Sequence, residues 1–174
     1  MDRTQIEPAA GPAGTEIRQA DPADGAGLRD FFGRLSVRTR VLRFFAPVTP
    51  TAAMLRRLAG EVPQVDVVVA LRGGVIIGHG MAVDEAAPGA DLAADIGVVV
   101  ADAWQGQGVG SALMRALISR AAGRGVTALR MDVLYDNHQV RAMIASHWAE
   151  LRTDRSADCL TVHVPLPQRH SKAA

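Results

Sequence analysis

A glycine-rich turn at residues 105–111 is the part of this sequence best suited to chemistry. It follows the apolar run Val98–Val100 and leads into a stretch with the apolar spacing of a helix. The first N–H groups of a helix lack intrahelical partners, and the helix dipole favours negative charge beside them. Glycines at 106, 108 and 110 allow the backbone to approach a phosphate closely. The pattern predicts a polyphosphate held by main-chain amides, and the alternative is a plain helix cap with packing glycines.

The residues around the turn argue against two common nucleotide motifs. Gly110 is followed by Ser111-Ala112 and not by the Gly-Lys-Ser/Thr ending of a P-loop. A dinucleotide fingerprint requires glycine at position 111, where this chain has serine. Asp132 lies about 20 residues further on, where a ribose-binding acid is expected, but too few residues follow to complete a doubly wound sheet. A nicotinamide cofactor is therefore the disfavoured interpretation.

The elements that position this turn are predicted from apolar spacing and from glycine and proline positions. Near the N-terminus we expect a short strand at 15–20, then helices at 21–35, 38–45 and 51–58. Two β-branched runs at 65–71 and 75–83, separated by Arg72-Gly73-Gly74, predict an antiparallel hairpin. We then expect a buried strand at 92–101, a helix at 108–123, a strand at 127–134, a helix at 136–149 and a last strand at 158–164. This order predicts an α/β (α+β) fold in which helices pack on a mixed sheet.

Composition indicates one globular domain. Of 174 residues, 48% are hydrophobic and 21% are charged, and the formal net charge of +1 gives no electrostatic argument for nucleic acid or a membrane surface. We expect a disordered tail at 1–14, a single domain at 15–167 and a second tail at 168–174. The sequence has neither the features of a signal peptide nor the roughly 18–20 apolar residues of a membrane helix. We therefore expect a cytoplasmic protein.

Metal-binding patterns are weak. A single cysteine excludes an intramolecular disulfide and a multi-cysteine metal site. His79 stands in a predicted strand without a second ligand-type residue at suitable spacing. His138 and His147 lie nine residues apart, which does not place them on one face of a helix. We expect no metal.

The turn and its surroundings resemble the GCN5-related N-acetyltransferases (GNATs). Gln105–Gly110 is similar to the Arg/Gln-x-x-Gly-x-Gly/Ala signature of that family, between an apolar strand and an amphipathic helix. Asp136-Asn137 falls where the family has an acidic residue and an asparagine at the start of its last helix. The segment Arg43-Phe44-Phe45 resembles the bacterial protein-lysine acetyltransferase branch in particular. The resemblance covers roughly residues 15–166 and implies a mostly antiparallel central sheet flanked by helices.

This resemblance implies acetyl-CoA as the co-substrate. Asn137 would hydrogen-bond to the pantetheine or to the region of the sulfur. The pantetheine amides would pair with the strand backbone of Val98, Val99 and Val100, and an N–H near Val98 or Val99 would stabilise the oxyanion of the thioester. The pyrophosphate would lie on the turn, whose contributing residues are Gln105, through its side chain, and Gly106, Gln107, Gly108, Val109, Gly110 and Ser111, through their amides.

Direct transfer to an amine requires a group that removes a proton, because a lysine amine has a pKa near ~10.4. Asp95, ten residues before Gln105, is the candidate base, and Asp91 is the alternative carboxylate. Lysine-modifying relatives commonly have glutamate at the position of Asp95. The shorter aspartate would act through a water molecule or would not act.

The general acid is less defined. Tyr135 is the candidate, since many relatives use a tyrosine in or after the last helix, and His138, Ser146 and His147 are nearby. The Gly-aromatic pair that ends this helix in the family is absent here. CoA thiol is also a good enough leaving group to depart largely unaided.

These features predict an N-acetyltransferase that moves an acetyl or short acyl group from acetyl-CoA to a primary amine. Protein lysine is the preferred acceptor over a small-molecule amine. The alternative from another class is a catalytically degenerate acyl-CoA-binding regulatory module, favoured by the short Asp95 and the missing Gly-aromatic pair. The expected partners are acyl-CoA and an amine acceptor, without nucleic acid or membrane, in a monomer or homodimer.

Overall fold

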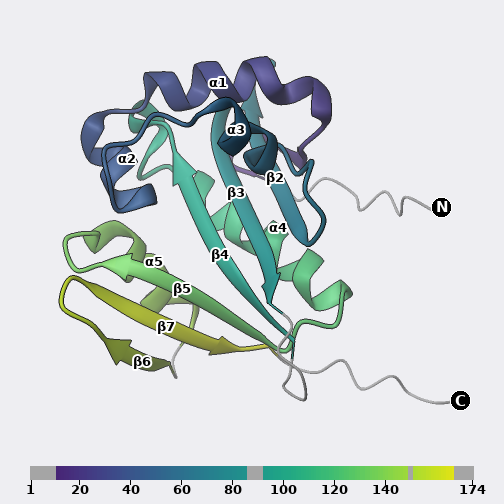
Figure 1. Cartoon of the computed structure of the whole chain (residues 1–174). Coiled ribbons are helices and arrows are strands. Elements are labelled where there is room, and N and C mark those ends of the chain that lie inside the picture. Colours follow the sequence, from purple (N-terminus) through teal and green to yellow (C-terminus); the bar gives the residue numbers. More distant parts are fainter. Residues whose placement is uncertain (1–10, 86–91, 149–150, 167–174) are drawn as a thin grey trace, which may run out of the picture.

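One seven-stranded sheet forms the centre of the protein (Figure 1). The computed structural model describes residues 11–85, 92–148 and 151–166. The strands are β1 (Glu16–Gln19), β2 (Val65–Arg72), β3 (Val75–Glu85), β4 (Ala93–Val100), β5 (Ala128–Leu134), β6 (Arg152–Arg155) and β7 (Cys159–Pro165). They lie in the order β1-β2-β3-β4-β5-β7-β6, and β4–β5 is parallel whereas every other neighbouring pair is antiparallel. The predicted mixed, mostly antiparallel sheet is confirmed.

Helices cover both faces of the sheet. The first three pack on one face, and the last two pack on the other (Figure 1). Their bounds are α1 (Gly25–Arg34), α2 (Val37–Phe44), α3 (Ala52–Leu58), α4 (Val109–Gly123) and α5 (His138–His147), with short 3₁₀ turns at Pro22–Asp24 and Asp102–Trp104. None of the helices in the described ranges combines the length and apolarity that crossing a bilayer requires.

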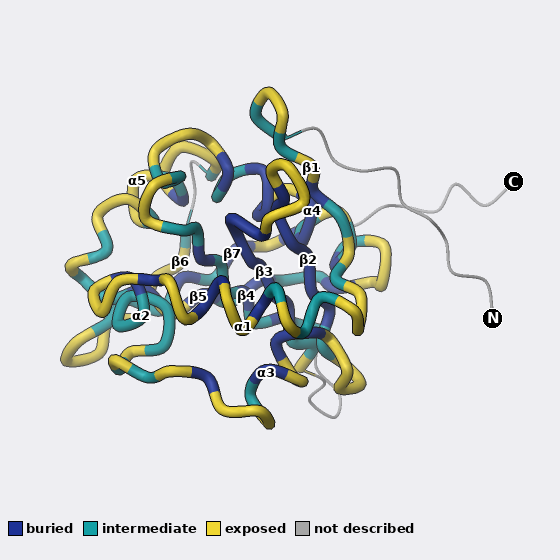
Figure 2. The backbone as a smooth tube through the Cα atoms, turned by 90° about the horizontal axis from the view of Figure 1, so that it is seen from above, coloured by how far each residue is buried: buried dark blue, intermediate teal, exposed yellow. Residues whose placement is uncertain are grey.

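The long helix α4 packs closely on β3 because two glycines make room for it. A Cβ built at Gly78 would lie 2.9 Å from Leu113 Cδ1, and one at Gly80 would lie 2.9 Å from Leu117 Cδ1. Both leucines are fully buried, as their four-residue spacing predicts. Figure 2 shows buried residues concentrated in β2 and β3 and on the inner sides of the helices. The close contact fixes the start of α4, and therefore the glycine-rich turn, against the middle of the sheet.

The predicted elements form close to their expected bounds, with one strand missed. That strand, β6, is exposed along its whole length and pairs only with β7 among the described strands. Its sequence Arg-Thr-Asp-Arg has no apolar alternation, so the usual strand pattern is absent. The helix expected to begin at Asp136 begins at His138, because Asn137 caps it by accepting a hydrogen bond from the N–H of Val140 (3.3 Å).

Asp102 connects the turn after β4 to the start of α2. Its carboxylate accepts hydrogen bonds from the N–H of Ser36 (3.0 Å), the hydroxyl of Ser36 (2.6 Å) and the hydroxyl of Thr39 (2.7 Å). Partial burial alone would raise the pKa of Asp102, but these hydrogen bonds outweigh it and lower the pKa below its usual value. Two segments more than 60 residues apart are thus held together by one carboxylate.

Replacing Asp102 should loosen this connection. We expect Asp102→Ala to destabilise the fold by about 1 kcal/mol, a value kept low because the site is largely exposed. Because the pKa is lowered in the folded state, the effect should be fully present above the unfolded-state pKa and should fade as the pH falls through the folded-state value. Urea unfolding at several pH values measures it. Asp136→Ala, at an exposed aspartate on the rim of α5, is the matched control and should change the free energy of unfolding little.

Candidate functional site

The sheet divides between β4 and β5. Their parallel register contains only Ala93↔Ala128, Ala94↔Leu129 and Asp95↔Arg130. Beyond these pairs β4 remains paired with β3 as far as Val100, and β5 remains paired with β7 as far as Leu134. Figure 1 shows the two strands diverging from this point. The edge of β4 that faces β5 is therefore left without strand partners from Ile96 onward.

The backbone of β4 presents Val98 and Val100 to this opening. The N–H of Ala101 donates to Ile77 O on the β3 side (2.9 Å), whereas Val100 O accepts from Gln105 Nε2 on the other side (3.1 Å). Successive residues of a strand present their polar groups to opposite edges. Val98 and Val100 therefore direct N–H and C=O groups into the opening, and Val99 directs its own toward β3. A ligand chain with amide groups would find a ready-made strand edge here.

The glycine-rich turn leaves amides free at the start of α4. Gly106 (φ 73°) and Gly108 (φ 81°) adopt left-handed backbone conformations that favour glycine. Gly108 caps α4 without a side-chain hydrogen bond, and the first backbone bond into the helix is Ala112 N–H to Gly108 O (3.1 Å). Within the described ranges, the amides of Val109, Gly110 and Ser111 donate to no protein acceptor. They form the positive, N-terminal end of a helix dipole, which suits a diphosphate.

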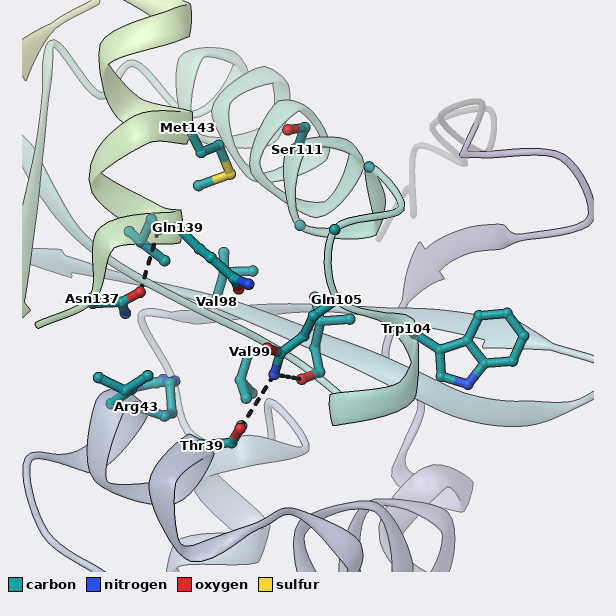
Figure 3. A pocket seen from close by; sticks show the side chains of 16 residues that line it. Thr39, Arg43, Val98, Val99, Trp104, Gln105, Ser111, Asn137, Gln139 and Met143 are labelled. Carbon is teal, nitrogen blue, oxygen red and sulfur yellow. Dashed lines mark hydrogen bonds between the residues drawn. The ribbon is translucent and has the colours of Figure 1, made fainter.

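These elements enclose a first cavity of about 360 Å³. Its wall contains nine of the eleven residues predicted to bind the cofactor, namely Val98, Val99, Val100, Gln105, Gly106, Gly108, Gly110, Ser111 and Asn137. The other two do not line it: Val109 is buried in the core, and Gln107 is exposed, with Nε2 donating to Ala103 O (2.9 Å). Figure 3 shows Asn137 and Arg43 at one end of this cavity and Trp104 at the other. Turn, strand edge and last helix thus face one space.

Gln105 is held within the site by two hydrogen bonds from its side chain. Besides Val100 O, Nε2 donates to the hydroxyl of Thr39 (3.2 Å), which itself donates to Asp102. The side-chain amide therefore braces the turn against β4 and α2. Only its oxygen remains for an added partner.

A second cavity of about 350 Å³ adjoins the first on the side of β5. Twelve of its eighteen lining residues are apolar, among them Phe44, Phe45, Met81 and Met131, and its charged lining residues include Asp95 and Arg130. Six residues line both cavities: Leu42, Arg43, Val98, Asn137, Val140 and Met143. The two spaces therefore meet where β4 leaves β5.

Asp95 lies at the closed end of the opening, in the second cavity. Arg130 Nε lies 2.7 Å from Asp95 Oδ1, Arg130 Nη2 donates to Oδ2 (2.9 Å), and Arg130 Nη1 lies 3.4 Å from Glu85 Oε2. Burial raises the pKa of Asp95 to about 6; Arg130 opposes that rise and Glu85 adds to it. The carboxyl is mostly ionised at neutral pH and still close enough to neutrality to accept a proton.

Comparison with known families decides the assignment. The profile of the Acetyltransferase (GNAT) family matches residues 37–147, which is more than half of the chain. The chain belongs to the GNAT acetyltransferase family. It is accordingly an acyl-CoA-dependent N-acyltransferase, and the predicted GNAT membership is confirmed. No curated protein matches the sequence.

Solved GNAT structures share the fold at low sequence identity. The GNAT domain of S. lividans PAT is 24% identical, with a TM-score of 0.79 over 87% of this chain and 90% of that one. The ribosomal-protein-alanine N-acetyltransferase of Brucella melitensis is 20% identical, with a TM-score of 0.71 over 86% of this chain and 99% of that one. The Salmonella typhimurium protein yncA, solved with its cofactor acetyl-CoA, is 20% identical, with a TM-score of 0.66 over 92% and 98%.

Several residues predicted for this GNAT site lie away from it. Tyr135 lines neither cavity, and its hydroxyl donates to Ser156 O (3.0 Å). His138, Ser146 and His147 are exposed and also line neither cavity. Asp91 lies outside the described residues. The structure thus brings Asp95 to the opening and leaves the predicted acid, Tyr135, outside it.

Three residues of the GNAT site were missed by sequence reasoning: Thr39, Gly97 and Arg43. Thr39 lines the first cavity and Arg43 lines both, each from α2. Thr39 stands in no binding motif, and Arg43 was noted only within a segment resembling the protein-lysine acetyltransferase branch, without a role in the site. Gly97 gave a usable signal, since a glycine inside an apolar strand often marks a close approach. A Cβ there would lie 2.6 Å from Arg43 Cζ. The described residues contain no group of three His, Cys, Asp or Glu side chains placed to hold a metal ion.

A side chain at Gly110 should block the first cavity without disturbing the fold. A Cβ at this position would lie in ordinary contact with Val100 Cγ2 (3.7 Å) and Met143 Sδ (3.8 Å), and the backbone there is not left-handed. We expect Gly110→Glu to weaken acetyl-CoA binding by about 100-fold or more, because it places a carboxylate beside the amides that receive the diphosphate. Calorimetric titration measures the loss. Gly123→Glu, at the far end of α4 with open space around it, should bind normally, and equal affinity in both variants would contradict the assignment of the turn.

Proposed function

We propose that this GNAT protein transfers an acetyl group from acetyl-CoA to a primary amine by direct attack on the thioester, with protein lysine as the acceptor. The observation that carries the proposal is the meeting of two cavities where β4 leaves β5. One runs along the free strand edge to the open amides of the turn, and the other contains Asp95. A thioester and an amine that entered from opposite sides would come together at the junction.

The first cavity suits the donor. The diphosphate would lie on the amides of the turn, and the pantetheine would pair with the backbone of Val98 and Val100. The structurally similar yncA was solved with its cofactor acetyl-CoA, which supports acetyl-CoA as the donor. Gln105 and Asn137 would add side-chain hydrogen bonds at the two ends.

The second cavity suits the acceptor. Its largely apolar wall matches the hydrocarbon arm of a lysine side chain, and Asp95 supplies a carboxylate at the closed end. An ammonium group that reached Asp95 would lose its proton to the carboxylate, directly or through water, and become nucleophilic. A small-molecule amine is the second candidate acceptor, since the same wall would accept an alkylamine. A degenerate module that only binds acyl-CoA is the candidate from another class, because Asp95 is held by Arg130.

An acceptor panel separates these functions. With saturating acetyl-CoA, release of free thiol should be faster with an Nα-blocked lysine peptide or a lysine-bearing protein than with butylamine or a peptide bearing only a free N-terminus. Calorimetry of acetyl-CoA alone provides the control for donor binding. Acetyl-CoA binding without thiol release for any amine would support the degenerate module. Turnover only with small amines would show that the acceptor is a small-molecule amine and not a protein lysine.

The pH dependence of turnover tests Asp95. Because only the ionised carboxyl accepts a proton, kcat should fall as the pH drops through about 6. Arg130→Met removes the charge that lowers the pKa of Asp95, so this limb should move to higher pH. Asp95→Asn should lower kcat by about 10²-fold or more with little change in acetyl-CoA affinity. Asp30→Asn on the outer side of α1 is the matched control, and an unaltered kcat for Asp95→Asn would discard the aspartate as base.

A further inference from the structure

The junction of the two cavities contains few polar groups. Of the six residues that line both cavities, only Arg43 and Asn137 have polar side chains; Val98 adds its backbone. If the thioester enters along one cavity and the amine along the other, the reacting atoms must lie between these groups. Figure 3 shows Arg43, from α2, and Asn137, the N-cap residue of α5, at the same end of the first cavity.

Asn137 is already engaged in the fold. Its Oδ1 accepts the N–H of Val140 and caps α5, which leaves only Nδ2 for a ligand. The amide carries no charge. The charged side chain at the junction is Arg43.

The Arg43 guanidinium has no counter-ion among the described residues. Its Nε is buried and has no hydrogen-bond partner, and no ion pair or hydrogen bond of the Arg43 side chain occurs in residues 11–85, 92–148 or 151–166. The guanidinium lies against Gly97, where a Cβ would be 2.6 Å from Cζ, and Cζ lies 5.1 Å from the centre of the Phe44 ring. The residue is only half-buried as a whole because it faces the two cavities. By contrast, Arg130 in the same cavity is paired with Asp95.

The buried part of this guanidinium would gain from a negative partner, and the ring of Phe44 supplies only a weak one. Burial lowers the pKa of Arg43 to about 10, so the group keeps its charge at neutral pH. No acidic side chain of the described residues lies within ion-pair distance of it. The two cavities that Arg43 faces are the places where a ligand, or the reaction itself, would set negative charge against it.

We propose that Arg43 is a catalytic residue that donates a charge-assisted hydrogen bond to the thioester carbonyl oxygen during acyl transfer. This inference rests on the proposed function. The lone pair of the neutral amine forms the new C–N bond, and the carbonyl π pair moves onto the oxygen that Arg43 contacts together with the N–H of Val98. When that pair returns, the C–S bond breaks and its electrons leave on sulfur. Asp95 has by then released the first ammonium proton to solvent, so the surplus proton of the amine passes to Asp95 and then, through solvent, to the thiolate.

The chemistry of the junction favours this role over binding of the acceptor in its ground state. The acceptor approaches as an ammonium or a neutral amine, and the charge of Arg43 would repel the first and favour the second. Negative charge arises only after attack, so the interaction strengthens as the reaction proceeds. Groups that bind more strongly to the transition state than to the ground state accelerate the chemical step.

Arg43→Met tests the proposal with three readouts. We expect kcat to fall by about 10²–10³-fold, as for loss of one oxyanion donor, while acetyl-CoA affinity stays near the native value. Isotope-edited infrared spectra of bound [¹³C]acetyl-CoA, without any acceptor, should show a lower carbonyl stretching frequency in the native protein than in the variant. The Tm of the free protein should equal or exceed the native Tm, because an unpaired buried charge has been removed. Arg43→Lys should restore part of both activity and frequency shift.

Gly97→Ala and Arg38→Met complete the design. The new Cβ at position 97 would displace the flexible guanidinium while keeping its charge, so Gly97→Ala should reproduce the infrared and kcat changes. Arg38, exposed on the same helix, is the matched control, and its variant should be native in all three readouts. An unchanged carbonyl frequency with native kcat in Arg43→Met, or a lowered Tm that accounts for the lost activity, would overturn the role of Arg43. Failure of acetyl-CoA to bind the native protein would instead overturn the proposed function as well.

Discussion

The short parallel pairing of β4 with β5 is the constraint on which the rest of the site depends. Three residue pairs hold the strands together, and the pairing ends at Asp95↔Arg130. Because the strands then separate, β4 keeps one edge unpaired inside the protein, where an unpaired edge is normally avoided. The same separation creates both cavities and sets their common boundary. A longer parallel ladder would close the sheet and leave a GNAT chain without a place for its two substrates to meet.

Two arginines illustrate how differently the fold uses similar charges. Arg130 is matched with Asp95 and Glu85 at the point where the strands part, so its charge stabilises the junction and adjusts the acidity of Asp95. Arg43 approaches the same space from α2, lies against Gly97 and has no acidic partner among the described residues. The charge of Arg130 is thus matched within the protein, whereas that of Arg43 faces the two cavities.

The features that could be predicted from the sequence are those that depend on residues close together in the chain. Apolar spacing located β1 to β5, β7 and the five helices, and the glycine turn with its free amides followed from local helix geometry. The strand β6 was not predicted, because a fully exposed strand has no apolar alternation.

The site residues Arg43 and Thr39 were not predicted, because their position beside β4 depends on contacts between residues more than 50 positions apart in the chain. The pairing of Asp95 with Arg130 depends on the register of two strands separated by a helix, which composition does not encode. Tyr135 was close in sequence to the site, yet its hydroxyl faces Ser156.

The hydrogen bonds that run from Asp102 through Thr39 to Gln105 have a consequence for how the substrates influence each other. They join the phosphate-facing turn to the helix that walls the acceptor space. If binding of the donor at the turn shifts α2, the affinity of the site for the acceptor changes by some factor. Thermodynamic linkage then requires the acceptor to change the affinity for the donor by the same factor. In that case the two substrates bind interdependently, each by way of α2.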